Sequence, residues 1–167
     1  PPLTFAFFGA SALPLKGLPI GYYTDLGLGE PTDPEVAARI DDVARTMERQ
    51  GAILVPMAPP FTPEDLATSE IFYKVRARTE LYTLAPEARG LSDVVWPWSE
   101  DVDELPAVEF YRIFAHLQIL REKTCQLLAD VDFLLLASVP RPPYRADLPG
   151  YSASNLFEPW ANTYLFN

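Results

Sequence analysis

The strongest constraint on the fold is a strand–helix–strand pattern in the first third of the sequence. The apolar run LPIGYYTD (18–25) predicts a short strand, and AILVPMAPP (52–60) predicts a second one. Between them, Asp33 and Pro34 are typical of a helix start, and Gly51 is typical of the residue that follows a helix. Two strands joined through one helix lie parallel in a sheet, so the sequence predicts an α/β unit.

The helix between these strands has a single apolar face, which we expect to be buried. Apolar residues recur along that face at helical spacing, and they are Val36, Ile40, Val43, Ala44 and Met47. A second helix is predicted to begin after Thr62, because Thr62 and Asp65 have the spacing of a capping box. Its buried side is expected to contain Leu66, Phe72 or Ile71, Val75, and Thr79 or Tyr82.

The second half of the chain predicts one more long helix and one more strand. Residues 85–105 indicate a polar connection broken by prolines, and a helix is expected over residues 106–129. The apolar run DFLLLASVP (132–140) predicts a strand buried on both faces, and residues 155–167 predict a short helix. The expected buried face of the long helix comprises Phe110, Phe114, Leu117, Arg121, Thr124 and Leu128.

These elements place the chain in the α/β class, with about three mainly parallel strands and three to four helices. A length of 167 residues suits one domain, so residues 1–167 are expected to form a single α/β unit. Residues 1–17 are expected to be an irregular lead-in. The chain has no initiator Met and ends on an apolar run, so we interpret the unit as a fragment of a larger domain.

Composition excludes several classes of function. Hydrophobic residues make up 49% of the chain and aromatic residues 13%, which is typical of a globular protein with a packed core. The formal net charge of −10 disfavours binding to nucleic acid or to an anionic membrane surface. No apolar run approaches the roughly 20 residues needed to cross a bilayer. We therefore expect a cytoplasmic protein with no nucleic-acid partner and no membrane span.

Residues that could carry chemistry are few. Cys125 and His116 are the single members of their types, which leaves no disulfide and no cysteine-based metal cage. Cys125 is expected to be a small buried hydrophobe, and His116 is expected to have a structural role. We predict no metal site and no cofactor.

Three short segments have an alternative, chemical interpretation. The Gly27–Leu28–Gly29 loop resembles a phosphate-binding turn, but Glu30 and Pro31 follow it, so a simple turn is favoured. The acidic run 100–104 offers paired carboxylates, although a solvated helix entry is the more ordinary interpretation. Ser152 and Ser154 lie in a Ser-rich stretch with no neighbouring base, which favours a polar turn.

Taken in order, several segments resemble the C-terminal third of amidase signature family enzymes. The longest is LPIGYYTDLG…EPTDPEVAARIDDVARTMERQGAILVPMAPP, and it is followed by FYKVRARTEL, LADVDFLLLASVPRPP and WANTYLFN. The resemblance in the order of elements and in short sequence motifs covers residues 18–167. It implies that the three strands belong to a larger amidase-type sheet.

The resemblance also implies an activity. Amidase signature enzymes hydrolyse carboxamide C–N bonds with a Ser–Ser–Lys triad, without metal or cofactor. Their diagnostic Gly/Ser-rich segment is absent from this sequence, and Lys16, Lys74 and Lys123 do not stand in the family's lysine context. We therefore assign no catalytic residue to this chain, and expect it to be inactive alone.

What the resemblance implies for this segment is a scaffold and one wall of the substrate pocket. Trp160, Tyr164 and Asn167 would be the substrate-binding residues: the two aromatic rings would pack against the apolar part of a small amide. Asn167 would hold a loop by hydrogen bonds. A fragment of this kind is also expected to expose sheet surface and to self-associate through it.

Two other classes of function remain open from the sequence. The first is a non-catalytic α/β binding or interaction module. The second is a small hydrolase that uses the carboxylates of residues 100–104. Neither the amide substrate nor the oligomeric state follows from these residues.

Overall fold

The computed structural model describes residues 14–28, 31–89, 93–148, 150–151, 156, 158–160 and 162–166. Its sheet has three parallel strands in the order β2–β1–β3, which are β1 (Pro19–Tyr22), β2 (Ile53–Pro56) and β3 (Phe133–Leu135). Ile20 in the central strand lies opposite Leu54 on one side and Phe133 on the other. The predicted α/β class and the parallel pairing of the first two strands are confirmed.

Helix α1 (Pro34–Arg49) joins β1 to β2, as its sequence signals predict. The Asp33 carboxylate accepts a hydrogen bond from the backbone N–H of Glu35 at 2.8 Å, which satisfies one of the free amides of the first turn. At the other end Gly51 has φ of +95°, a left-handed conformation that glycine adopts without strain. Local chemistry therefore fixes both ends of this helix.

Four more helices and three short 3-10 turns follow in the part of the chain that the structure describes. They are α2 (Pro63–Tyr82), α3 (Pro86–Arg89), α4 (Val95–Trp98), η1 (Glu100–Val102), α5 (Ala107–Leu127), η2 (Glu158–Trp160) and η3 (Tyr164–Phe166). The segment expected to be a plain connection, residues 85–105, thus contains α3, α4 and η1. In the described residues of the predicted C-terminal helix, the structure has two 3-10 turns instead.

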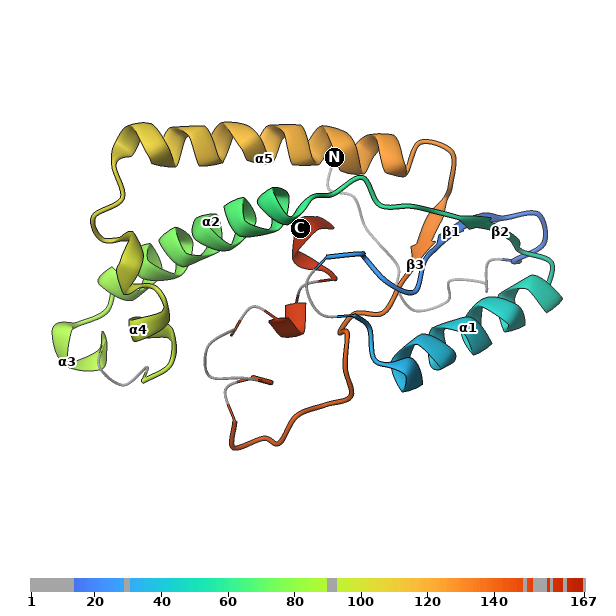
Figure 1. Cartoon of the computed structure of the whole chain (residues 1–167), viewed down its shortest axis with the longest axis horizontal. Helices are drawn as coiled ribbons and strands as arrows, with labels where there is room; N and C mark the ends of the chain where they lie inside the picture. The colour runs from blue at the N-terminus through green and yellow to red at the C-terminus, as the bar shows by residue number, and fades with distance from the viewer. Residues whose placement is uncertain are drawn as a thin grey trace, which may run out of the picture.

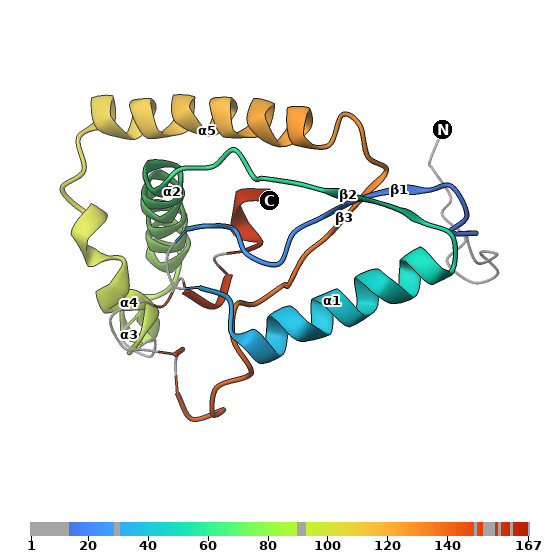
Figure 2. The same cartoon turned by 45° about the vertical axis from the view of Figure 1, so that its right-hand side comes forward.

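The helices are divided between the two sides of the sheet. Helices α1 and α5 lie on opposite sides of it, and α2 packs across α5 (Figures 1 and 2). A buried cluster lies where α2, α5 and the chain end meet, and it consists of Tyr23, Leu26, Phe61, Leu120, Tyr164 and Leu165. None of the helices in the described ranges is long and apolar enough to cross a membrane.

The predicted buried face of α5 is wrong, and so is the predicted burial of Cys125. The buried residues of α5 are Ile113 and Leu120, whereas Phe114 is 45% exposed. His116 and Lys123 lie on the same side as Ile113 and Leu120, because the four are spaced three or four residues apart. Their contact with a buried carboxylate on α2 turns this side inward, and Cys125 is left exposed on another side.

Two further burial predictions are wrong. Val43, expected in the apolar stripe of α1, is 42% exposed, while its neighbour Ala44 is buried. Phe133 is 52% exposed, because β3 is a three-residue edge strand and not the strand buried on both faces that the sequence predicts. Most of the expected lead-in, residues 1–17, lies outside the described residues.

Candidate functional site

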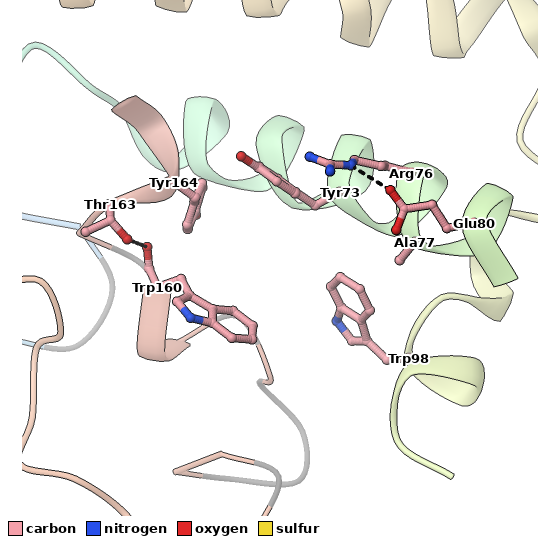
Figure 3. Close-up of a pocket in the computed structure, with 8 residues that line it drawn as sticks. All are labelled: Tyr73, Arg76, Ala77, Glu80, Trp98, Trp160, Thr163 and Tyr164. Carbon is pink, nitrogen blue, oxygen red and sulfur yellow. Dashed lines mark hydrogen bonds and ion pairs between the residues drawn. The ribbon is translucent and has the colours of Figure 1, made fainter. Parts of the chain in front are cut away.

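A cavity of about 390 Å³ opens between α2, α4 and the two C-terminal 3-10 turns. Its lining consists of Tyr73, Arg76, Ala77, Glu80, Trp98, Trp160, Thr163 and Tyr164. Figure 3 shows the rings of Tyr73, Trp98 and Trp160 around the open space, with the Arg76–Glu80 pair on the α2 side. A cavity of this size with a mainly aromatic wall is suited to a small apolar or aromatic ligand.

The structure brings together two of the three residues predicted to bind substrate. Trp160 and Tyr164 both line this cavity, and Trp160 is 51% exposed while Tyr164 is 5% exposed. Asn167 lies outside the described residues. The ring of Tyr164 packs edge-on against Tyr73 at 6.1 Å between centroids, and burial raises the pKa of its phenol. Tyr164 is therefore a neutral, fixed part of the wall.

The α2 side of the cavity was missed by the sequence reasoning. Tyr73, Arg76, Ala77 and Glu80 have the i, i+3, i+4, i+7 spacing of one helix face. That spacing is visible in the sequence, but the ion pair between Arg76 Nε and Glu80 Oε1, at 3.0 Å, is also the ordinary pattern of a solvated face. Nothing in the sequence alone distinguishes a polar cavity rim from a polar surface.

Trp98 reaches the cavity because the segment that carries it is bound to α2 by a buried cation. Arg78 is 6% exposed, and its Nε donates to Asp103 Oδ1 at 2.8 Å while Nη1 donates to the Trp96 carbonyl at 3.1 Å. The guanidinium also lies 3.7 Å from the centroid of the Trp96 ring, a cation–π contact. Its hydrogen bonds hold the pKa of Asp103 below the usual value.

A second cation strengthens the same attachment. Lys74 Nζ lies 2.7 Å from Asp101 Oδ2 and 5.8 Å from the centroid of the Trp98 ring. Two carboxylates of the acidic run 100–104 therefore pair with α2. The four acidic residues of the run are exposed, as in the solvated helix entry that the sequence favours, and Asp101 and Asp103 are in addition paired with cations of α2.

Asp65 is the most deeply buried charge in the described part of the chain, at 1% exposed. Its carboxylate lies 2.7 Å from His116 Nε2 and 2.7 Å from Lys123 Nζ, and it accepts the Thr62 amide at 2.8 Å. Burial alone would raise the pKa of Asp65, but the hydrogen bonds from Lys123, His116 and Thr62 outweigh it and lower the pKa. The cluster joins α2 to α5, so the role of His116 is structural.

Other candidate chemistry is limited. No group of three or more His, Cys, Asp or Glu side chains in the described ranges could hold a metal ion. In the Gly27 loop, Asp25 accepts the backbone N–H groups of Gly27 and Thr32, each at 2.6 Å, so these amides are not available to a phosphate. Gly29, Ser152 and Ser154 lie outside the described residues.

Comparison with known proteins supports a relationship in fold. No protein-family profile matches the chain, and neither does any curated protein sequence. Among solved structures, the chain is similar to a bacterial aryl acylamidase of the amidase signature family, with a TM-score of 0.71 and 19% sequence identity. The similarity covers 92% of this chain and 35% of that one. The chain thus has the fold of part of an amidase signature enzyme, as its sequence predicts.

Proposed function

We propose that this chain is the scaffold and one pocket wall of a serine-dependent amide hydrolase of the amidase signature type. The observation that carries the proposal is the shared fold over 92% of the chain. The chain spans 35% of the similar structure, and neither Lys74 nor Lys123 is available as a base, since each is ion-paired. The catalytic serines would therefore come from another part of a longer enzyme.

The substrate in this proposal is a small carboxamide with an aryl group. The similar structure is named an aryl acylamidase, and the cavity here presents aromatic rings from three parts of the chain. Trp160 and Tyr164 would pack against the aryl ring, which gains from edge or face contacts with other rings. Asn167 would hold the adjoining loop by hydrogen bonds.

A binding experiment tests the wall. Titration of the chain with 4-nitroacetanilide in a calorimeter should show saturable binding, and Trp160→Ala should weaken it about tenfold through loss of ring contact. Tyr111→Ala is the matched control, because Tyr111 is 70% exposed on α5 and lies outside the cavity. Equal affinities of the Trp160→Ala and Tyr111→Ala variants for 4-nitroacetanilide would show that Trp160 does not contact the bound ligand.

A labelling experiment tests the chemistry. The chain alone should neither hydrolyse 4-nitroacetanilide nor react with a fluorophosphonate, since both require an activated serine. Specific labelling of any serine would contradict the proposal. In the full-length enzyme, alanine at Trp160, Tyr164 and Asn167 together should lower kcat/KM, and an unchanged kcat/KM would remove these residues from the site.

The second candidate is a non-catalytic binding module that uses the same cavity without any hydrolysis. The favouring observation is that the residues described as lining this cavity include no serine, cysteine or histidine. The two candidates differ in gene context: an upstream Gly/Ser-rich segment with its lysine supports the hydrolase, and a start codon near Pro1 supports the module. In either case we propose a cytoplasmic protein that does not bind nucleic acid.

Self-association through the sheet belongs to the same proposal. Ile53 and Phe133 are 55% and 52% exposed, and they lie on the two edge strands β2 and β3. Exposed apolar edges favour pairing with another chain. Sedimentation velocity should show concentration-dependent association, and Ile53→Lys should reduce it; a monomer at all concentrations would contradict this part.

A further inference from the structure

A second cavity, of about 500 Å³, lies between the two long helices on the other side of Tyr73 and Tyr164. We call it the α2–α5 groove, and its lining includes Phe72, Phe114, Leu117, Arg121, Thr124 and Leu165. Its volume lies within the roughly 300–1,000 Å³ typical of small-molecule sites. Phe114, Leu117, Arg121 and Thr124 belong to the helix face that the sequence predicted to be buried. Here Leu117 and Thr124 are half-buried at the groove, whereas Phe114 and Arg121 are exposed.

Arg121 is the one charged side chain among the described residues that line the groove. Its neighbours one turn away on α5 are Leu117, Gln118, Thr124 and Cys125, none of which is a carboxylate. No ion pair of Arg121 occurs in the part of the chain that the structure describes. The guanidinium is exposed at the rim of an apolar groove with its donors available.

Several other helical arginines have a carboxylate partner. Arg45 pairs with Asp42 at 2.7 Å and Arg76 with Glu80 at 3.0 Å, each within one turn of its own helix. On α5 itself, Arg112 pairs with Glu109 at 3.2 Å. Arg49 and Arg89 also have no ion pair among the described residues, but they donate hydrogen bonds to Thr46 Oγ1 and to two backbone carbonyls. No such acceptor for Arg121 is found in the described ranges.

We propose that the α2–α5 groove binds an amphiphile with one carboxylate, such as a medium-chain fatty acid. The hydrocarbon chain lies between α2 and α5 against Phe114, Leu117 and Leu165, and the carboxylate accepts hydrogen bonds from Arg121. Tyr73 and Tyr164 line both cavities, so the ligand contacts the back of the wall of the aromatic cavity. The proposal is independent of the amide-hydrolysis role.

The test compares ligands that differ only in the head group. Dodecanoate and dodecanol are titrated into the whole chain by calorimetry, below the micelle concentration of dodecanoate and the solubility limit of dodecanol. The salt concentration is about 0.15 M, where long-range repulsion is screened. Dodecanoate should bind more tightly, and its affinity should exceed that of octanoate by about fourfold per added methylene until the groove is filled. Absence of saturable dodecanoate binding would overturn the proposal.

Paired variants locate the head group. Arg121→Gln should weaken dodecanoate binding about tenfold or more and leave dodecanol unchanged, because only the carboxylate uses the guanidinium. Arg112→Gln is the matched control on the same helix and should change neither affinity. If dodecanol binds as tightly as dodecanoate, or if both variants behave alike, the carboxylate assignment is wrong.

The single cysteine can show where the hydrocarbon chain of the ligand lies. Cys125 is exposed and lines the groove, so it can be alkylated with a maleimide and the rate followed by mass spectrometry. Bound dodecanoate should slow this reaction several-fold, and Phe114→Ala should reduce the protection. Unchanged alkylation under saturating dodecanoate would place the ligand elsewhere and would overturn the proposal.

Discussion

The two halves of the molecule are stabilised in different ways. In the sheet half, which comprises the three strands and α1, the buried side chains are apolar, as Ile20 and Ala44 illustrate. In the helical half, which comprises α2 to α5 and the C-terminal turns, burial includes polar groups. All the buried polar residues of the described chain belong to the helical half, and they are Asp65, Ser69, Arg78, Ser99 and Asn162.

This difference shows which kind of interaction specifies each half. Apolar burial is nondirectional, so an apolar pattern and two helix caps are enough to define the sheet half. A buried charge is unfavourable unless its partners are in place, so the pairs of Asp65 and Arg78 select one arrangement of the helices around them. The aromatic cavity and the α2–α5 groove belong to the helical half, and their walls depend on that arrangement.

The largest expected effect is that of removing the buried charge on α2. Asp65→Asn keeps the helix cap but leaves Lys123 and His116 without their anion, so we expect a loss of about 3 kcal/mol in the free energy of unfolding. Urea denaturation followed by circular dichroism measures it. Asp42→Asn is the control, because the Asp42 side chain is 60% exposed in its pair with Arg45 and its loss should have a much smaller effect.

The pH dependence of that difference is the second prediction. The folded pKa of Asp65 is lowered relative to the usual value of about 3.9, so its stabilising effect is complete above the unfolded pKa. It is lost as the pH falls through the folded pKa, where the carboxylate becomes protonated. Wild-type protein and Asp65→Asn should therefore differ by a constant amount from pH 7 to about pH 5 and converge below about pH 4. A constant difference down to pH 3 would contradict the ion-pair explanation.

Crowding in the centre of the sheet gives the third prediction. A Cβ at Gly21 would overlap Met57 Sδ and lie 3.1 Å from Leu134 Cδ1, so Gly21→Ala should destabilise the protein by about 2 kcal/mol. Gly27→Ala is the matched control, because Gly27 has φ of +71° but no atom within 4 Å of the new methyl group. It should show only the backbone strain of about 1 kcal/mol. Equal losses of stability in the two variants would mean that crowding at Gly21 adds nothing to the cost of the substitution.

The sequence predicts the sheet half well because its signals are local. Asp33 and Gly51 define the two ends of α1. The apolar runs at β1 and β2 pair in parallel because a single helix connects them. The exceptions are Val43 and Phe133, which are exposed because no described element packs over them. Periodicity along a helix or strand carries no information about whether another element covers it.

The site was predicted only in part, for a similar reason. Trp160 and Tyr164 were predicted through the resemblance, and both line one cavity, but their role in substrate binding stays a prediction. Trp98 and the α2 wall depend on Arg78 and Asp103, which are 25 residues apart. A charge that is bound to a distant partner has the same local pattern as one in water, so His116, Lys123 and Arg78 could not be recognised as buried partners.

The Arg78 cluster gives the fourth prediction, within the helical half. Arg78→Lys keeps the charge but loses the paired donors to Asp103 and the stacking on Trp96, and should destabilise by about 1 kcal/mol. The emission of Trp96 and Trp98 should shift to longer wavelength as their segment loosens from α2. Arg76→Lys is the control, since the Arg76 side chain is 62% exposed. Matching effects of the two variants would remove the distinction between a buried and a solvated pair.

The smallest expected effect is on the exposed face of α1, where pattern and structure disagree. Val43 is 42% exposed, so Val43→Lys should change the free energy of unfolding by less than about 0.5 kcal/mol. Any such change should be in the stabilising direction, because lysine has a higher helix propensity than valine. Its neighbour Ala44 is 3% exposed, and Ala44→Leu should destabilise by about 2 kcal/mol through overpacking. Urea midpoints of the two variants, measured side by side, locate the buried edge of the helix. A loss of 2 kcal/mol or more for Val43→Lys would show that the apolar stripe is buried as the sequence predicts.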